Sequence, residues 1–134
     1  CFPIRTIRDS RYRLVWNLSP EVEFANACTQ SRYFQSMVAA ARAGDESAAD
    51  LVAKYQYRPE FELFDCDADP LEMTNLADNP QHTKTVERLK RRLDEWMAAQ
   101  GDQGIETELD ALLHQRKYKG LTREEALSRW QMEK

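Results

Sequence analysis

Residues 58–77 read RPEFELFDCDADPLEMTNLA, and they join a strand pattern to a turn that precedes the longest helix pattern of the chain. Residues 60–66 (EFELFDC) alternate apolar and polar side chains, which predicts a β-strand. Asp69 followed by Pro70 predicts a helical turn capped by the aspartate, and Asn75 is suited to a left-handed exit from it. The stretch therefore predicts a strand, a tight turn and a change of direction toward the next element.

The next element is an amphipathic helix over residues 80–100. Asn79 and Pro80 repeat the cap-plus-proline device at its start, and Gly101 is a natural C-terminal stop. Charged side chains cover most of its surface, while its apolar side chains form one stripe at Val86, Leu89, Leu93, Trp96 and Met97. We expect this stripe to cover one face of a sheet.

The N-terminal part predicts a β-hairpin over residues 2–17. Residues 2–8 (FPIRTIR) and 12–17 (YRLVWN) both alternate and are rich in strand-forming residues, and three polar residues separate them. Within the second strand, Tyr12, Leu14 and Trp16 share one face, so that face is the one expected to be buried.

A helical insertion is predicted at residues 29–56, between the hairpin and the strand at 60–66. Residues 29–43 have apolar side chains at helical spacing, and residues 46–56 form a second, shorter helix that is expected to bury Leu51, Val52 and Tyr55. Gly44 ends the first helix and Asp45 is a natural N-cap for the second.

The remaining residues, 105–134, predict a helical tail. A first stretch places Ile105, Leu109, Leu112 and Leu113 on one face, and a second opens with the capping-box spacing of Thr122 and Glu125 and carries Leu127 and Trp130. The fold class expected is α+β: a small antiparallel sheet of about three to four strands, packed by a long amphipathic C-terminal helix, with a helical insertion after the first hairpin. Residues 1–104 form one subdomain (hairpin 2–17, insertion 29–56, strand 60–66, helix 80–100), and residues 105–134 form the tail.

Composition narrows the class of function. At 134 residues the chain fits one domain, and its net charge of −4 gives no general attraction to nucleic acid. No apolar run reaches the length of a membrane span. Three cysteines (Cys1, Cys28, Cys66) without a C-x-x-C spacing favour buried free thiols over a metal or redox site. We therefore expect no nucleic-acid partner and no membrane span.

The most tempting site is the aspartate run at 65, 67 and 69, which starts like a calcium-binding EF-hand loop. That loop requires Gly at its sixth position, where this chain has Pro70, and Glu at its twelfth, where it has Leu76. His82 and His114 lie in helical contexts that favour exposed structural roles. We therefore predict no catalytic, cofactor-binding or metal-binding residue in this chain.

Several pieces of the sequence resemble the sulfatases, a family of the alkaline-phosphatase-like superfamily. The signature near the C-terminus of those enzymes is matched by Glu62-Leu63-Phe64-Asp65, Asp69-Pro70-x-Glu72 and Asn75-Leu76-Ala77. The hairpin and the end of the long helix agree with the family as well, so the resemblance covers residues 2–105. The insertion and the segment 12–24 (YRLVWNLSPEVEF) are most similar to the heparan N-sulfatase (sulfamidase) branch.

The resemblance implies a parent protein with a large N-terminal catalytic domain that holds formylglycine and calcium and hydrolyses sulfate esters or sulfamates on a carbohydrate such as a glycosaminoglycan. This chain would be its non-catalytic C-terminal part, inactive alone, packed on the catalytic domain and shaping one wall of the substrate cleft. Ile7, Val15 and Phe64 are the expected docking surface. An extracytoplasmic site (periplasmic, secreted or lysosomal) is implied. The alternative is a free-standing protein-interaction module.

The first five residues, CFPIR, also resemble the sulfatase motif C-x-P-S-R, whose cysteine becomes the catalytic formylglycine. Ile4 stands where that motif has serine, and residues 5–8 are predicted to continue as a strand, whereas the family's motif opens a helix. We therefore reject Cys1 as the catalytic cysteine of a sulfatase motif. An independent hydrolase that uses Cys1 is the third and least favoured hypothesis.

Overall fold

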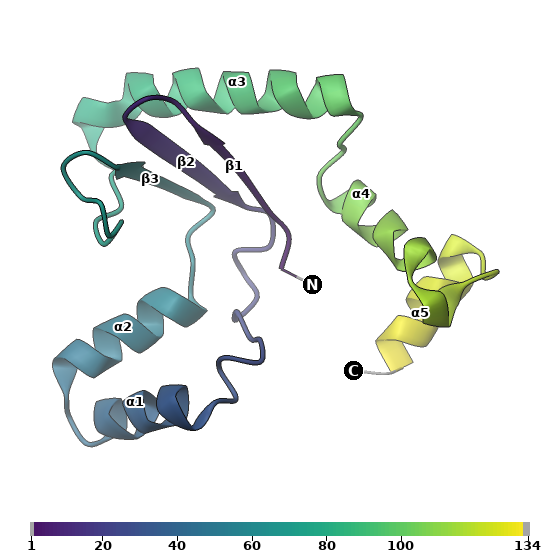
Figure 1. Ribbon diagram of the computed structural model, residues 1–134, viewed down its shortest axis with the longest axis horizontal. Helices are drawn as coiled ribbons and strands as arrows, with labels where there is room; N and C mark the ends of the chain where they lie inside the picture. Colours follow the sequence, from purple (N-terminus) through teal and green to yellow (C-terminus); the bar gives the residue numbers. More distant parts are fainter. Residues whose placement is uncertain (1, 133–134) are drawn as a thin grey trace.

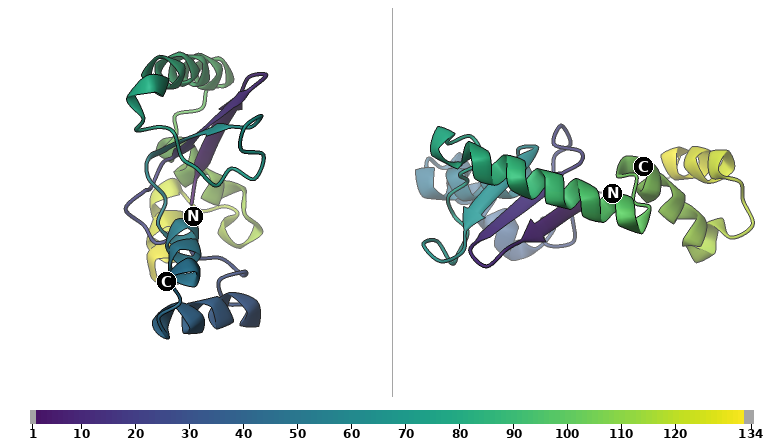
Figure 2. Two further views of the ribbon diagram at one scale, coloured as in Figure 1. Left: turned by 90° about the vertical axis from the view of Figure 1, so that its left-hand side faces the viewer. Right: turned by 90° about the horizontal axis from the view of Figure 1, so that it is seen from above.

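A computed structural model describes residues 2–132 and shows an α+β fold in three layers (Figure 1). Among these residues the sheet has three antiparallel strands in the order β1-β2-β3. A long helix, α3, lies on one side of the sheet, and a helix pair lies on the other side (Figure 2). The strands are β1 (Ile4–Arg8), β2 (Tyr12–Asn17) and β3 (Phe61–Asp65).

The strand register decides which side chains face α3. Leu14 on β2 lies opposite Ile7 on β1 and Leu63 on β3, so these three side chains share the face covered by the helix. Val15 and Phe64 lie on the other face, because side chains alternate along a strand. The predicted docking surface of Ile7, Val15 and Phe64 is therefore wrong for Ile7, which packs against the core under α3. Val15 and Phe64 face away from α3.

Helix α3 (Thr83–Gln100) follows a 3₁₀ turn (Pro80–His82) that Asn79 caps, so the predicted helix 80–100 divides into two pieces. Leu89 and Leu93 are buried completely or nearly so, and Leu89 forms the main core cluster with the leucines of β2 and β3. Trp96 is 53% exposed, contrary to prediction, because it lies on the edge of the apolar stripe. Gly101 ends the helix in the left-handed conformation that glycine tolerates.

The helical insertion consists of α1 (Arg32–Arg42) and α2 (Glu46–Gln56), as predicted except that α1 starts later. Ser31 caps α1, and Asp45 caps α2 by accepting a hydrogen bond from the backbone N–H of Ala48 (3.0 Å). Leu51 was expected to be buried but is 41% exposed. It lines the space between α2 and the sheet, which the two helices leave open.

The turn after β3 differs from the prediction. Residues 70–75 form no helix, and Glu72, rather than Asn75, has a positive φ of 55°. Asn75 instead covers the outer edge of β3: its Oδ1 accepts from the backbone N–H of Leu63 (2.9 Å), and its Nδ2 donates to the carbonyl of Phe61 (3.2 Å). An edge strand that is satisfied in this way is closed to further pairing.

The tail contains two short helices joined by 3₁₀ turns. The capping box of Thr122 and Glu125 is confirmed, since the Thr122 N–H donates to Glu125 Oε2 (2.8 Å). Arg5 ties the tail to the sheet through ion pairs with Asp102 and Glu108. The elements are α4 (Ile105–Asp110), 3₁₀ turns at Ala111–His114 and Arg116–Tyr118, and α5 (Arg123–Met132), with a small core of Leu112, Tyr118 and Ala126.

Two predictions lie outside what the structure describes, namely the rejection of Cys1 as a catalytic cysteine and the packing of the Trp130 side chain. Within residues 2–132, no helix combines the length and apolar character needed to cross a membrane. The predicted buried thiols are not found at the two described cysteines, because Cys28 is exposed and Cys66 is only half-buried.

Candidate functional site

The sheet face opposite α3 forms the floor of a hollow of about 640 Å³. Helix α2 and the loop at residues 71–75 form its walls. We call it the free-face hollow. Its floor consists of side chains that share one face of the sheet, namely Ile4, Thr6, Val15, Glu62 and Phe64. The apolar side chains of its walls include Leu51, Tyr57, Leu71 and Met73.

Four large apolar side chains in the walls of the free-face hollow are exposed. Leu71 is 81% exposed, Tyr57 62%, Met73 45% and Leu51 41%. Leu71 and Met73 lie on the irregular loop after β3, so no regular element holds them against the core. A concave apolar surface of this kind is typical of a protein or ligand interface.

Charged groups border this hollow at the end where β3 finishes. Arg13 on β2 forms an ion pair with Glu72, and this contact accompanies the unusual backbone conformation of Glu72. Lys54 on α2 reaches across the hollow, and its Nζ lies 3.4 Å from the carbonyl oxygen of Met73. These contacts connect the loop to both the sheet and α2.

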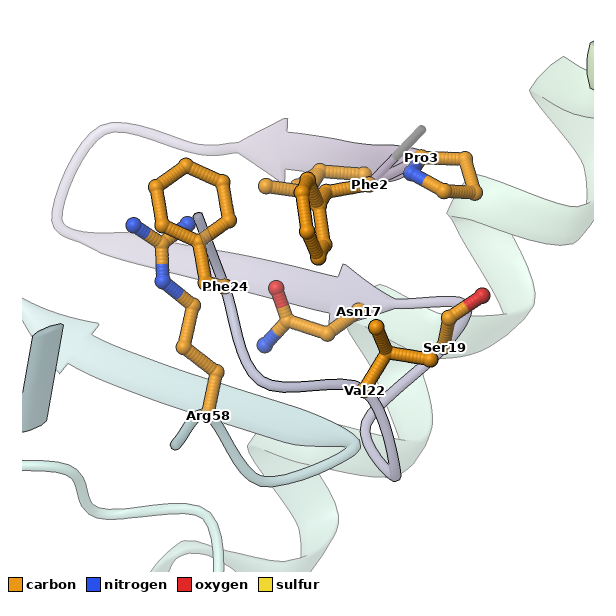
Figure 3. Close-up of a pocket in the computed structure, with 8 residues that line it drawn as sticks. Phe2, Pro3, Asn17, Ser19, Val22, Phe24 and Arg58 are labelled. Carbon is orange, nitrogen blue, oxygen red and sulfur yellow. The ribbon is translucent and has the colours of Figure 1, made fainter. Parts of the chain in front are cut away.

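A small pocket of about 20 Å³ lies at the other end of the same face, and we call it the Asn17 pocket (Figure 3). Asn17 is only 5% exposed. Its Nδ2 donates to the carbonyl of Pro59 (2.7 Å) and to Glu62 Oε2 (2.9 Å), while its buried Oδ1 has no partner among the described residues. The lining consists of Phe2, Pro3, Ile4, Asn17, Ser19, Val22, Phe24 and Arg58.

Arg58 belongs to both the Asn17 pocket and the free-face hollow. Its guanidinium lies 4.0 Å from the ring centroid of Phe24 and 5.8 Å from that of Tyr55, which is cation–π geometry. Phe24 in turn packs edge-on against Phe2, with centroids 4.8 Å apart. Arg58 forms no ion pair with any described carboxylate, so its charge is held in place by aromatic rings.

Asp65, the first aspartate of the run and the last residue of β3, has a structural role. Asp65 is 5% exposed, accepts two hydrogen bonds from Arg11 Nε (2.9 and 3.1 Å) and also accepts from the backbone N–H groups of Asp67 and Ala68 (both 3.2 Å). The Arg11 guanidinium, followed by these backbone donors, lowers the pKa of Asp65 to about 2 despite the opposing effect of burial. Its oxygens are therefore engaged in holding the turn.

Other candidate ligands do not converge within the described part of the chain. Residues 2–132 contain no group of three or more His, Cys, Asp or Glu side chains arranged to hold a metal ion. His82 is half-buried, contrary to the exposed role expected, and packs edge-on against Tyr12 (centroids 5.8 Å apart). His114 is exposed, as expected. That the chain lacks catalytic residues stays a prediction.

Sequence reasoning missed the Asn17 pocket. Its floor comes from the end of β2, and its guanidinium comes from the segment after α2, some forty residues later in the chain. The one local signal is Asn17 itself, an amide at a strand position next to Leu18, in a strand otherwise rich in strand-forming residues. The alternation of apolar and polar residues along the strand does not reveal that Asn17 Oδ1 has no hydrogen-bond donor within residues 2–132.

Comparison with known proteins places this fold in a family. No family model matches the chain. Two ulvan-active sulfatases from Formosa agariphila are similar to it, at 33% and 34% identity over 102 residues, and so is human N-sulphoglucosamine sulphohydrolase, at 33% identity over 101 residues. The alignments cover 71–75% of this chain but only 17–20% of each relative.

The chain thus spans about a fifth or less of the length of the curated relatives it matches. The ulvan-active enzymes and the human enzyme match the chain at nearly the same identity, so the property they share with it is the sulfatase family as a whole. The chain belongs to the sulfatase family.

Proposed function

We propose that this chain is the C-terminal, non-catalytic part of a larger sulfatase that hydrolyses sulfate esters or sulfamates on a carbohydrate. Its role is to pack on the N-terminal catalytic domain of the same parent protein and to help shape the substrate cleft. The single observation that carries the proposal is the free-face hollow, an apolar concave surface on the side of the sheet that α3 leaves uncovered.

The physical argument starts from the layers. A sheet buries its apolar side chains against a second layer, and α3 supplies a closely packed layer on one side. On the other side α2 stands over the sheet and leaves the free-face hollow between them. There, Val15 and Phe64 form a floor over which Leu71 and Met73 expose apolar surface. The relatives have about four fifths of their length outside the matched region, so the rest of the parent is the occupant whose presence the comparisons support.

The chemistry is assigned to the parent's other domain. Sulfatases are expected to use formylglycine and calcium, and residues 2–132 offer no set of ligands that fits calcium. We therefore derive no catalytic step for this chain and expect it to be inactive alone. The relatives' names support a sulfated carbohydrate as the parent's substrate, with a glycosaminoglycan as one candidate, and an extracytoplasmic location belongs to the same proposal.

The test uses the gene that encodes the chain. If it encodes a domain with C-x-P-S-R upstream, that domain and this chain, produced as two polypeptides, should associate in calorimetry. The double substitution Leu71→Asp and Met73→Asp should abolish association, because it places two carboxylates on the apolar walls of the free-face hollow. Tyr33→Asp is the matched control, since Tyr33 is 78% exposed on α1 and does not line the hollow.

Two results would overturn the assignment to a larger sulfatase that docks through the free-face hollow, and a third would overturn the non-catalytic assignment. One is association that survives the double substitution as well as it survives Tyr33→Asp. The other is a gene in which Cys1 directly follows an initiator methionine, which would favour the free-standing interaction module. Hydrolysis of an aryl sulfate by the purified chain alone would contradict the non-catalytic assignment.

A further inference from the structure

The side-chain amide of Asn17 has a fixed orientation and an unused acceptor. Both partners of its Nδ2, the carbonyl of Pro59 and the carboxylate of Glu62, are acceptors, so exchanging the amide oxygen and nitrogen would place two pairs of oxygens in contact. The oxygen is therefore the atom that lines the pocket. A buried acceptor without a donor costs about 1–3 kcal/mol, so a donor from outside the described residues is expected there.

The size of the pocket limits that donor. A volume of about 20 Å³ admits one water-sized group and excludes a sugar ring or a side chain of any length. Phe2 and Phe24 form apolar walls, and Val22 at the rim is 45% exposed. One hydroxyl of a larger ligand fits this space, with the body of the ligand at the rim.

A second group faces the same pocket. The guanidinium of Arg58 is positioned by Phe24 and Tyr55 and has no carboxylate partner among the described residues. A guanidinium held in this way retains its planar fork of N–H donors for an anion such as a sulfate or carboxylate. Figure 3 shows Arg58 and Asn17 among the residues that line this pocket, together with Phe2 and Phe24.

We propose that the Asn17 pocket binds an anionic sugar unit, with one sugar hydroxyl donating to Asn17 Oδ1 and the sulfate or carboxylate of the sugar accepting from Arg58. This inference rests on the proposed function, because the carbohydrate is taken from there. It adds to that function the two residues, Asn17 and Arg58, through which the cleft wall would bind the sugar. The register places Asn17 at one end of the free face and Phe64 at the other. Sugar binding and domain docking therefore use neighbouring parts of one face, and Arg58 lines both.

The test is hydrogen exchange measured by mass spectrometry on the full product of the gene, with glucose 6-sulfate as the probe. Peptides that cover residues 17–24 and 56–60 should exchange more slowly with the probe, whereas a peptide from α5 should not change. Site-resolved exchange is chosen because the parent's catalytic site would bind the same probe. Glucose and inorganic sulfate, tested separately, should each protect these peptides less than glucose 6-sulfate at equal concentration.

Variants assign the effect to Arg58. Arg58→Gln should raise the probe concentration for half-maximal protection by about tenfold or more, the effect expected for a lost hydrogen bond to a charged group. Arg92→Gln removes the same charge from an exposed position on α3 and should leave the probe concentration for half-maximal protection unchanged. Arg58→Lys keeps the charge and should have a smaller effect than Arg58→Gln, and it serves as the second variant if the glutamine form does not fold.

Three results would overturn the inference. Absence of protection in the unsubstituted protein would mean that a structural water or a segment of the parent already satisfies Asn17. Equal protection by inorganic sulfate would reduce the pocket to a simple anion site. Equal effects of Arg58→Gln and Arg92→Gln would show that only net charge matters. None of these results changes the outcome expected for the calorimetric association test, so the docking proposal is tested independently.

Discussion

Truncation of Leu89 to alanine tests whether α3 and the sheet form one core. Leu89 has no exposed surface and packs with Leu14 and Leu63 in the main cluster. Leu→Ala at a fully buried site removes the transfer free energy of the lost methyl groups and leaves a cavity, which together cost about 2–5 kcal/mol. We expect about 3 kcal/mol here, a large share of the roughly 5–15 kcal/mol by which domains are stable.

The assay is urea unfolding of the 134-residue chain, followed by far-UV circular dichroism, with thermal unfolding as a second measurement. A loss of about 3 kcal/mol should lower the urea midpoint without changing the slope and should lower Tm by about 10 °C. Leu71→Ala is the matched control, because it removes the same atoms from a side chain that is 81% exposed. Its effect in the isolated chain should stay within about 0.5 kcal/mol.

Equal shifts for Leu89→Ala and Leu71→Ala would refute the packing of α3 on the sheet. A further distinction follows in the full product of the gene. There Leu71→Ala should become destabilising if the free-face hollow is covered by the catalytic domain, whereas the effect of Leu89→Ala should be the same in both forms.

Three further predictions concern the turn, the tail and the acidic strand end. The Asp65 carboxylate, whose pKa is lowered to about 2 chiefly by Arg11, stabilises the fold above about pH 4 and loses that contribution as the pH falls toward 2; Tm should fall across this window, and less steeply in Asp65→Asn. A flat profile in the unsubstituted chain would contradict this. Gly104→Ala should lower Tm more than Gly120→Ala, because both glycines have positive φ but only at Gly104 would a Cβ meet Leu18, at 3.0 Å; equal shifts would mean that Leu18 moves aside freely. Asn75→Ala should cost about 1–3 kcal/mol in urea unfolding, since it removes the side-chain hydrogen bonds along the edge of β3, and a change below about 0.5 kcal/mol would contradict that role.

Local patterns predicted most elements of the fold because each depends on nearby residues. The spacing of apolar side chains and the cap at Asp45 located α2 to the residue, and the alternation in residues 12–17 located β2. The EF-hand interpretation was rejected on the positions of Pro70 and Leu76, and the structure shows Asp65 holding the turn with Arg11 and backbone donors.

Errors arose where one element meets another. Asn75 was read as a left-handed exit because asparagine tolerates that conformation, whereas its amide is used by β3, fourteen residues back at Phe61. Trp96 and Leu51 were expected to be buried from helical spacing alone. Spacing shows which side chains share a helix face, but the width of the neighbouring layer decides how many of them are covered.

The sequence by itself determined the family, the order of the elements and the amphipathic stripe of α3, since these follow from short-range periodicity and from a contiguous signature. Only the tertiary structure decided that Ile7 faces α3, that Arg5 ties the tail to the sheet, and that Asn17 shares a pocket with Arg58. Each of these depends on strand register or on contacts between segments far apart in the chain. Such contacts are set by the packing of layers against one another, which no local pattern records.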